Sequence, residues 1–254
     1  MKLARRIFVS IGLAAACLAG AVALWYGIIH ALGLQPYILP TPKAVAMALG
    51  AQYRVLLGYL AATLGSGLAG ICISTVLAFA CAAAFASNPR LADTFMPFMV
   101  AVKNAPVVAL APLVMLFLGR GLATSVVVVM VVSFLPMLVN CLQGFQAANR
   151  RHLELMHVYA ARADQVFWKV RFPFALPYVF AGLRTAVPAA VLGALLAEWL
   201  TGAKGIGSFI LETASMRDMD VLWAGIVVCM GASMALFWLT VLAERFVQRR
   251  IPAA

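Results

Sequence analysis

The feature that most constrains this chain is a series of long apolar runs, each long enough to cross a lipid bilayer as one helix. The runs cover residues 7–32, 56–86, 95–118, 122–141, 176–200 and 221–243. A spanning helix takes roughly 20 apolar residues, and only helices and closed barrels satisfy their own backbone hydrogen bonds in lipid. Apolar residues make up 65% of the chain, whereas a soluble domain holds about half. The sequence therefore predicts an all-α membrane protein with about six transmembrane helices.

The first run begins like a secretory signal peptide, because the basic residues Lys2, Arg5 and Arg6 precede it. The apolar region of a signal peptide has only about 7–15 residues and is followed by a small-residue cleavage site. The run at 7–32 is longer and carries Trp25 and Tyr26 near its end, as is typical of a membrane interface. We therefore expect an uncleaved first transmembrane helix.

The distribution of Lys and Arg predicts the orientation of the spans. With the N-terminus inside, the outer loops hold only Lys43, Arg54, Arg120, Lys204 and Arg217. The inner segments hold Lys2, Arg5, Arg6, Arg90, Arg150, Arg151, Arg162, Lys169, Arg171, Arg245, Arg249 and Arg250. Cytoplasmic segments carry the excess of basic residues, so both termini are predicted to be cytoplasmic.

This topology divides the chain into three parts. Residues 1–33 form the first transmembrane helix with its cytoplasmic N-terminus, and residues 34–55 form a periplasmic loop. Residues 56–250 form a five-helix core that includes a long polar cytoplasmic loop at 143–173. No separate soluble domain is expected.

Several other functional classes are excluded by the residues themselves. The net charge of +11 lies in short clusters between apolar runs, not on the polar face that nucleic acid requires. The five cysteines form no CxxC pair and the three histidines are scattered, so no metal site is predicted. A phosphate-binding loop needs G-x-x-x-x-G-K-[S/T], and the nearest stretch, 202–208, has the wrong order. We therefore expect neither catalytic residues nor a bound nucleotide.

The loop between the fourth and fifth predicted spans carries the most informative motif. Its positions are Glu154, Leu155, Met156, Ala160, Val170, Phe172 and Pro173. Their spacing resembles the loop motif of ATP-binding-cassette importer permeases, in which E-A-A, three residues, G, nine residues and I-x-L-P recur. Leu155 and Met156 replace the alanine pair. Ala160 replaces the glycine, so small size is kept but the φ > 0 freedom of glycine is lost.

In that family the loop implies a short coupling helix, here inside residues 150–171. Such a helix lies in a groove of a soluble ATPase and passes its movement to the flanking spans. From the residues alone, an ordinary basic amphipathic helix on the membrane surface is the alternative.

Four further stretches resemble the nitrate, sulfonate and taurine-type permeases of this class. They are L-P-T-P at 39–42 with Val45, then Pro106, Ala109, Pro112 and Gly119, then A-L-P-Y-V-F-A-G-L-R at 175–184, and Glu198 followed by G-I-G at 205–207. Their order and spacing follow the family from about residue 34 to residue 250. The chain is thus similar to the inner-membrane component of a binding-protein-dependent importer, with a type I importer fold.

The resemblance implies a set of partners. They are a second copy of the permease, two cytoplasmic ATPase subunits that hold ATP and Mg²⁺, and a periplasmic binding protein that delivers a small anionic solute. The chain itself would carry no cofactor and would sit in the bacterial inner membrane. The alternative is a stand-alone secondary carrier or channel, which predicts inverted repeats that we do not see. A second alternative is a structural membrane scaffold, but that function would give no role to the proline-rich run at 95–118 or to Lys103 within it.

Four residues are candidates for the translocation path: Lys103, Asn104, Pro106 and Glu198. Ionisable residues inside spans usually face a protein interior or a pathway, and a proline there frees a carbonyl that a neighbour must satisfy. Lys103 is placed to attract an anion or, alternatively, to bond such a carbonyl. For Arg184, also in a span, extension of the side chain to the cytoplasmic interface is the simple alternative.

Overall fold

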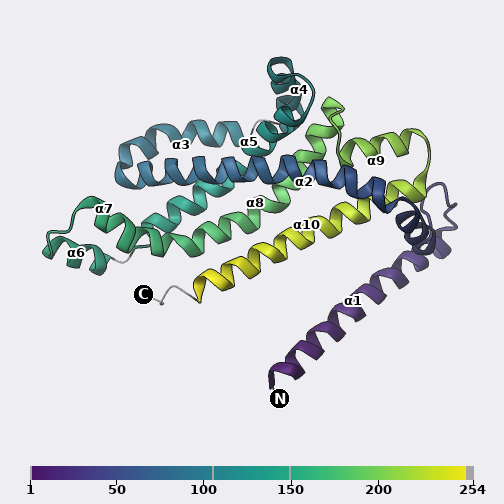
Figure 1. The fold of residues 1–254 in the computed structure, drawn as a ribbon, viewed down its shortest axis with the longest axis horizontal. Helices are drawn as coiled ribbons and strands as arrows, with labels where there is room; N and C mark the ends of the chain where they lie inside the picture. Colours follow the sequence, from purple (N-terminus) through teal and green to yellow (C-terminus); the bar gives the residue numbers. More distant parts are fainter. Residues whose placement is uncertain (1, 105, 149, 250–254) are drawn as a thin grey trace. The chain divides into compact units, whose positions relative to one another are not determined.

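The computed structural model describes the backbone of residues 2–104, 106–148 and 150–249. Within these ranges the side chains of residues 2–11, 14, 15, 89, 102–104, 107 and 150 are not described. All regular elements of the described chain are helical (Figure 1). In order they are α1 (Lys2–Leu32), α2 (Pro42–Ser87), α3 (Pro89–Asn104), α4 (Val107–Leu118), α5 (Leu122–Gln146), α6 (Arg150–Val158), α7 (Ala163–Val166), the π-helical turn η1 (Phe167–Arg171), α8 (Phe172–Thr201), α9 (Ile206–Ser215) and α10 (Met219–Gln248).

Four stretches of the described chain are long and apolar enough to cross a membrane. They are α2, α5, the continuous stretch Ala163–Thr201 from α7 to α8, and α10. Ala16–Leu32 in α1 and Val108–Leu118 in α4 are shorter apolar helices. The all-α membrane architecture predicted from the apolar runs is confirmed, and in the described part of the chain every run except the third lies within one helix.

The third run, residues 95–118, is two helices and not the single span that the apolar pattern predicts. α3 ends at Asn104, and α4 begins at Val107 directly after Pro106, whose backbone is extended (φ −64°, ψ 121°). Proline has no backbone N–H and cannot continue the hydrogen-bond ladder of a helix interior. The carbonyl of Pro106 instead accepts the N–H of Ala109 at 2.8 Å and so starts the first turn of α4.

The segment at 34–55, expected as a loop, is helical from Pro42 onward. Thr41 precedes the helix, and its Oγ1 accepts the N–H of Ala44 at 3.2 Å. Threonine before a first-turn proline is a favourable helix start, so the segment begins a helix at Pro42. A bend remains at Gln52, whose φ/ψ (−110°, 17°) is not helical.

The described chain divides into two compact parts. The first comprises residues 1–57 and 209–228. In it the indole N–H of Trp25 donates to the carbonyl of Pro40 at 3.1 Å. The ring centroids of Trp25 and Trp223 are 5.1 Å apart, so α1 and the start of α10 are joined within this part through an aromatic contact.

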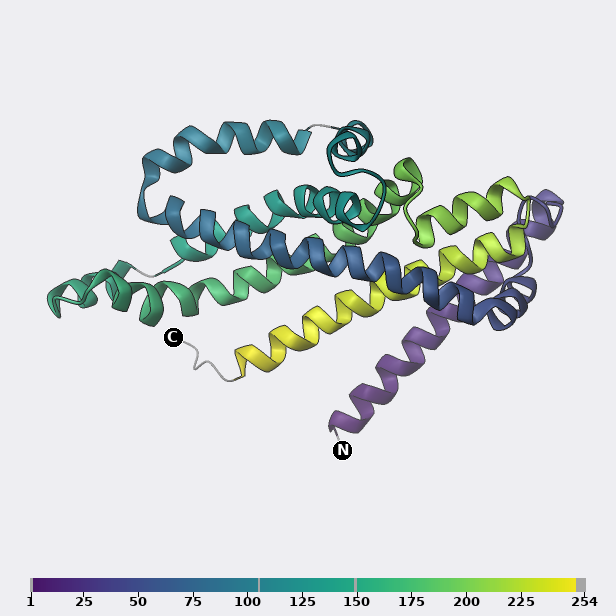
Figure 2. The ribbon, with the colours of Figure 1, turned by 45° about the horizontal axis from the view of Figure 1, so that its top comes forward.

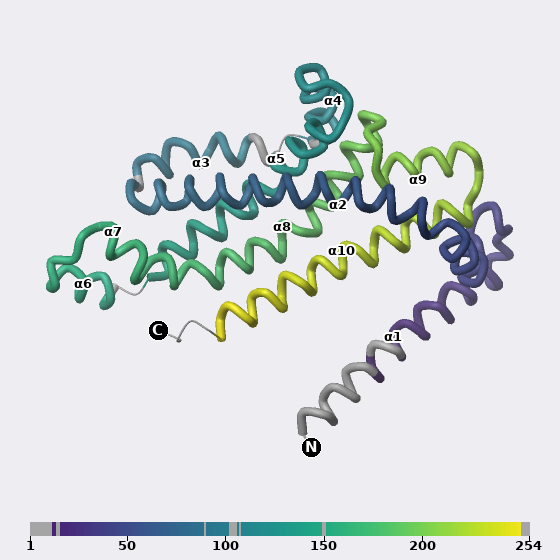
Figure 3. The backbone as a smooth tube through the Cα atoms, viewed as in Figure 1, coloured from purple at the N-terminus to yellow at the C-terminus, as the bar shows by residue number. Residues whose placement is uncertain are grey.

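The second part comprises residues 58–208 and 229–254 and contains the main apolar core. The core lies between α2, α5 and α8, with buried residues such as Ala82, Leu138 and Ala190. α5 and α8 run side by side in Figures 1 and 2, and Figure 3 traces their backbones. At Gly144 a Cβ atom would lie 2.9 Å from the Cα of Ala175. Glycine therefore permits a close approach of these two helices.

Candidate functional site

The coupling segment, residues 154–173 with the coupling helix predicted inside 150–171, comprises most of α6, a turn, α7, η1 and the start of α8 (Figure 1). The end of α6 and the residue after it expose three large apolar side chains: Leu155, Val158 and Tyr159 are 52%, 81% and 73% exposed. Spacings of three and four place them on one face of a helix end. Glu154 is exposed as well, and Met156 is half-buried. A cluster of exposed apolar side chains marks a contact surface more often than an isolated one does.

The turn that ends α6 has a left-handed residue at the position of the family's glycine. Ala160 has a φ of 48°. Its N–H donates to the carbonyl of His157 at 2.9 Å, and the N–H of Ala161 donates to that of Met156 at 2.9 Å. This pair of bonds around a left-handed residue is the Schellman helix end, which usually takes glycine. The turn is kept without the φ > 0 freedom of glycine, because alanine adopts the left-handed conformation at the cost of strain.

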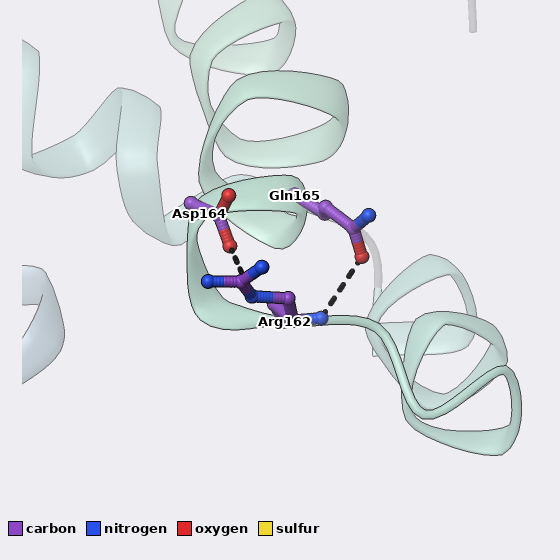
Figure 4. Close-up of polar contacts among 3 residues, drawn as sticks. All are labelled: Arg162, Asp164 and Gln165. Atoms are coloured by element: carbon purple, nitrogen blue, oxygen red, sulfur yellow. Dashed lines mark hydrogen bonds and ion pairs between the residues drawn. The ribbon is translucent and has the colours of Figure 1, made fainter.

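α7 restarts the chain after this turn. The backbone N–H of Arg162 donates to Oε1 of Gln165 at 3.0 Å, and its Nε lies 3.6 Å from Oδ1 of Asp164 (Figure 4). The Arg162 and Asp164 side chains are 83% and 64% exposed, so their ion pair adds little stability. The Gln165 bond matters more, because it satisfies a backbone donor at the helix start.

The end of the coupling segment is anchored in the second compact part. Val170 is buried, and Phe172 and Pro173 are half-buried at the start of α8. Nη1 of Arg171 donates to the carbonyl of Ala86 at 3.1 Å. Ala86 lies in the last turn of α2, where carbonyls lack helix partners and a cation complements the helix dipole. The segment thus has an exposed end at α6 and an anchored end at η1 and α8.

Glu198 is buried, with 1% of its surface exposed, near the end of α8. Its Oε2 accepts the N–H of Gly207 at 2.8 Å. Oγ1 of Thr63, from α2, accepts the N–H of Ile206 at 2.8 Å. These are the first N–H groups of α9, which have no partners inside the helix, and a carboxylate there is favoured by the helix dipole. Glu198 therefore caps α9, and its place in a translocation path stays a prediction.

The glycines after Glu198 explain why the acid and the G-I-G stretch occur together. A Cβ at Gly205 would overlap the carboxyl of Glu198. At Gly207 a Cβ would lie 2.7 Å from the carbonyl oxygen of Leu195 and 3.0 Å from Oε2 of Glu198. Only glycine lets the backbone approach the carboxylate this closely.

The other candidate path residues lie at the break in the third run. Pro106 is exposed and precedes α4. The side chains of Lys103 and Asn104 lie outside the described residues, so their predicted role stays a prediction.

Sequence reasoning missed the charged pair that joins α8 to α10. Nη1 of Arg184 in α8 lies 3.3 Å from Oε2 of Glu244 in α10. Oε1 of Glu244 also accepts the side-chain N–H of Gln248 at 3.0 Å. Glu244 directly follows the last apolar run at 221–243, and Arg184 lies within the run at 176–200. An acid at the end of one span and an arginine inside another are the signal that could have revealed the pair.

Comparisons with known proteins agree with this picture. Residues 70–251 match the family described as "Binding-protein-dependent transport system inner membrane component". The formylaminopyrimidine transport permease protein ThiX of Halalkalibacterium halodurans is 33% identical over 193 residues, which cover 76% of this chain and 77% of that protein. The riboflavin transport system permease protein RibX of Chloroflexus aurantiacus is 29% identical, with 90% and 86% covered. The taurine transport system permease protein TauC of Escherichia coli is 25% identical, with 98% and 90% covered.

A solved structure shares the fold. An inward-facing form of the MetNI methionine ABC transporter superposes with a TM-score of 0.61 at 18% identity, covering 79% of this chain and 96% of that chain. At this identity the likeness supports the fold alone. The family match confirms the resemblance that the motifs carried. The chain therefore belongs to the binding-protein-dependent transport system inner membrane components, as the multi-pass permease component of an ATP-binding-cassette importer and not its ATPase.

Proposed function

We propose that the segment from Glu154 to Pro173 is the docking site for the partner ATPase. The observation that carries the proposal is the exposed apolar face of Leu155, Val158 and Tyr159 at the end of α6. Removal of such a face from water on docking favours association by roughly 25 cal/mol per Å² of apolar surface buried. The anchored end at Arg171 supports the same proposal, because a docked helix must be held firmly to move the spans behind it.

The assembly around the permease follows from this proposal. One chain offers one docking segment, so an engine with two ATPase subunits needs a second copy of the permease. We propose a homodimer that receives solute from a periplasmic binding protein. The relatives' names record formylaminopyrimidine, riboflavin and taurine. For this chain we propose a small anionic solute, because Lys103 places a cation beside the break between α3 and α4.

The experiment is to measure ATPase association and solute-stimulated hydrolysis of two docking variants in lipid nanodiscs. Ala160→Trp places bulk beside the apolar face, and overpacking of a contact typically costs roughly 1–3 kcal/mol. Glu154→Lys reverses a charge within the motif. Both variants should insert normally and yet bind the ATPase about 5- to 150-fold more weakly, as that cost implies at tenfold per 1.4 kcal/mol.

Met216→Trp is the matched control. Met216 is exposed, at 69%, after α9, in a loop that the charge count places on the periplasmic side. It should leave ATPase association unchanged. If both docking variants keep full ATPase association and full transport, the segment from Glu154 to Pro173 is not the docking site.

A further inference from the structure

A group of aromatic rings joins the coupling segment to the helices behind it. Phe79 of α2 is the common member. Its ring centroid lies 5.0 Å from that of Phe145 in α5, 6.5 Å from that of Phe167 in η1 and 5.9 Å from that of Phe172 in α8. Phe145 and Phe167 also contact each other at 5.5 Å. All three contacts of Phe79 are edge-to-face, the arrangement that the aromatic quadrupoles favour.

The π-helical turn makes this arrangement possible. In an α-helix, residues five apart point about 140° away from each other, since each residue turns the chain by about 100°. In η1 the N–H of Phe172 donates to the carbonyl of Phe167, and the wider i→i+5 turn brings positions five apart close to one face. Phe167 and Phe172 therefore both reach Phe79. π-turns of this kind occur frequently at functional sites.

The ring group lies between the exposed docking segment and the spanning helices α2 and α5. η1 lies between Ala160 and Pro173, inside the docking segment itself. α2 and α5 are spanning stretches that build the core. In Figures 1 and 2 the C-terminal ends of α2 and α5 and the start of α8 lie at the same end of this compact part as α6 and α7. The Arg171 bond to Ala86 ties the same two elements, η1 and α2, at this end.

We propose that Phe79, held between Phe167 and Phe172, is a positioning residue that passes movement of the docking segment to α2 and α5. This inference rests on the proposed function, because it takes the segment to be where the ATPase docks. Interlocked rings transmit displacement because a packed core resists compression. The ring partners of Phe79 are Phe145, Phe167 and Phe172, whereas the docking face is on α6 and the residue directly after it. Removal of the Phe79 ring is therefore expected to leave ATPase binding intact while it weakens the coupling of ATP hydrolysis to import.

A purely structural role would give a different result. Phe85 provides the matched comparison, because it lies on the same helix, nearer its C-terminal end, and is 6% exposed. Its ring pairs with Phe95 of α3 at 6.4 Å and takes no part in the Phe79 group. Since Phe85 is more buried than the half-buried Phe79, Phe85→Ala should cost at least as much stability as Phe79→Ala.

The test compares Phe79→Ala, Phe79→Tyr and Phe85→Ala in full importer complexes reconstituted in proteoliposomes. The readouts are ATPase association, the ATP hydrolysed per solute imported, and the folded fraction. Phe79→Ala should bind the ATPase within about 2-fold of wild type yet raise the ATP used per solute by about 2- to 30-fold, the range of effects seen along coupling networks. Phe79→Tyr keeps the ring and should restore the wild-type ratio. The folded fraction of Phe85→Ala should hydrolyse as much ATP per solute imported as the wild type.

Three outcomes would overturn the inference. They are an unchanged ratio in Phe79→Ala, equal changes in Phe79→Ala and Phe85→Ala, and loss of ATPase association in Phe79→Ala, which would make the rings a support for the docking face. The last outcome is distinguishable from failure of the proposed function. In that failure Ala160→Trp and Glu154→Lys would both keep the ATPase, whatever Phe79→Ala does.

Discussion

Ala160→Gly should stabilise the docking turn, because it removes the strain of a left-handed alanine. Ala160 has a φ of 48° and is exposed, so its methyl group has little packing to lose. An L-residue in this conformation costs roughly 1–2 kcal/mol. The greater conformational entropy of glycine in the unfolded chain offsets roughly 0.5–1 kcal/mol of the relieved strain. The net gain is about 0.5–1 kcal/mol, or about 2- to 5-fold in the opening equilibrium of the turn at tenfold per 1.4 kcal/mol.

Hydrogen exchange of the backbone amides measures this gain directly. The N–H groups of Tyr159, Ala160 and Ala161 donate across the turn at 3.1, 2.9 and 2.9 Å. Their exchange should slow by the same factor of about 2 to 5 in Ala160→Gly, because local opening controls it. The neighbouring substitution Ala161→Gly should instead speed exchange, since glycine at an ordinary φ costs about 0.5–1 kcal/mol.

A second helix end supplies an internal comparison. Arg217, after α9, has a φ of 58°, and the N–H of Asp218 donates to the carbonyl of Thr213 at 3.0 Å. Arg217→Gly should therefore protect its own turn by a similar factor without altering ATPase association. Unchanged or faster exchange in Ala160→Gly, or equal effects of Ala160→Gly and Ala161→Gly, would refute the assignment of strain to the left-handed residue.

Four further predictions address the rest of the chain. Glu198→Ala should lower the free energy of unfolding by about 1–3 kcal/mol for the lost cap, and Gly205→Ala by a similar amount for the overlap with the carboxyl. In thermal unfolding, the double variant should lose less stability than the sum of the two single losses, and strict additivity would contradict the close contact. Single cysteines at Arg151 and Lys204 should label from opposite sides of the membrane with an impermeant reagent, whereas labelling of both from outside would contradict the predicted topology. Lys103→Met should depress import while assembly and basal hydrolysis persist, and import at the wild-type rate would leave only a structural role for the lysine. The mass of the purified importer should show two copies of this permease, and a second, different permease chain would contradict the homodimer.

The fold could be read from the sequence where the signal was local and repeated. The apolar runs predicted helices at 56–86, 122–141, 176–200 and 221–243, and the structure has long apolar helices there. The motif spacing located the family and the segment at 154–173. The break at Pro106 was visible as a proline but not as a helix end, because prolines inside spans are tolerated when neighbours satisfy the freed groups.

The sequence predicted where the candidate site residues lie along the chain, but not which residues contact one another. The bond from Ile206 to Thr63 joins residues far apart in the sequence, and so does the pair of Arg184 with Glu244. No periodicity encodes such pairs, since they depend on how helices pack. The positive φ of Ala160 was missed for another reason: propensity disfavours it, and the surrounding hydrogen bonds impose it.

The contact between Trp25 and Trp223 gives the protein an optical signature that needs no label. Two indole rings with centroids 5.1 Å apart and an interplanar angle of 53° are close enough, and sufficiently non-parallel, for their electronic transitions to couple. A paired positive and negative band in circular dichroism follows from such coupling. Trp168, Trp199 and Trp238 are exposed, at 61%, 46% and 52%, and contribute ordinary emission instead. Trp223→Phe should therefore abolish the paired band while most of the fluorescence remains, which makes the compact part that contains α1 observable by itself during unfolding or turnover.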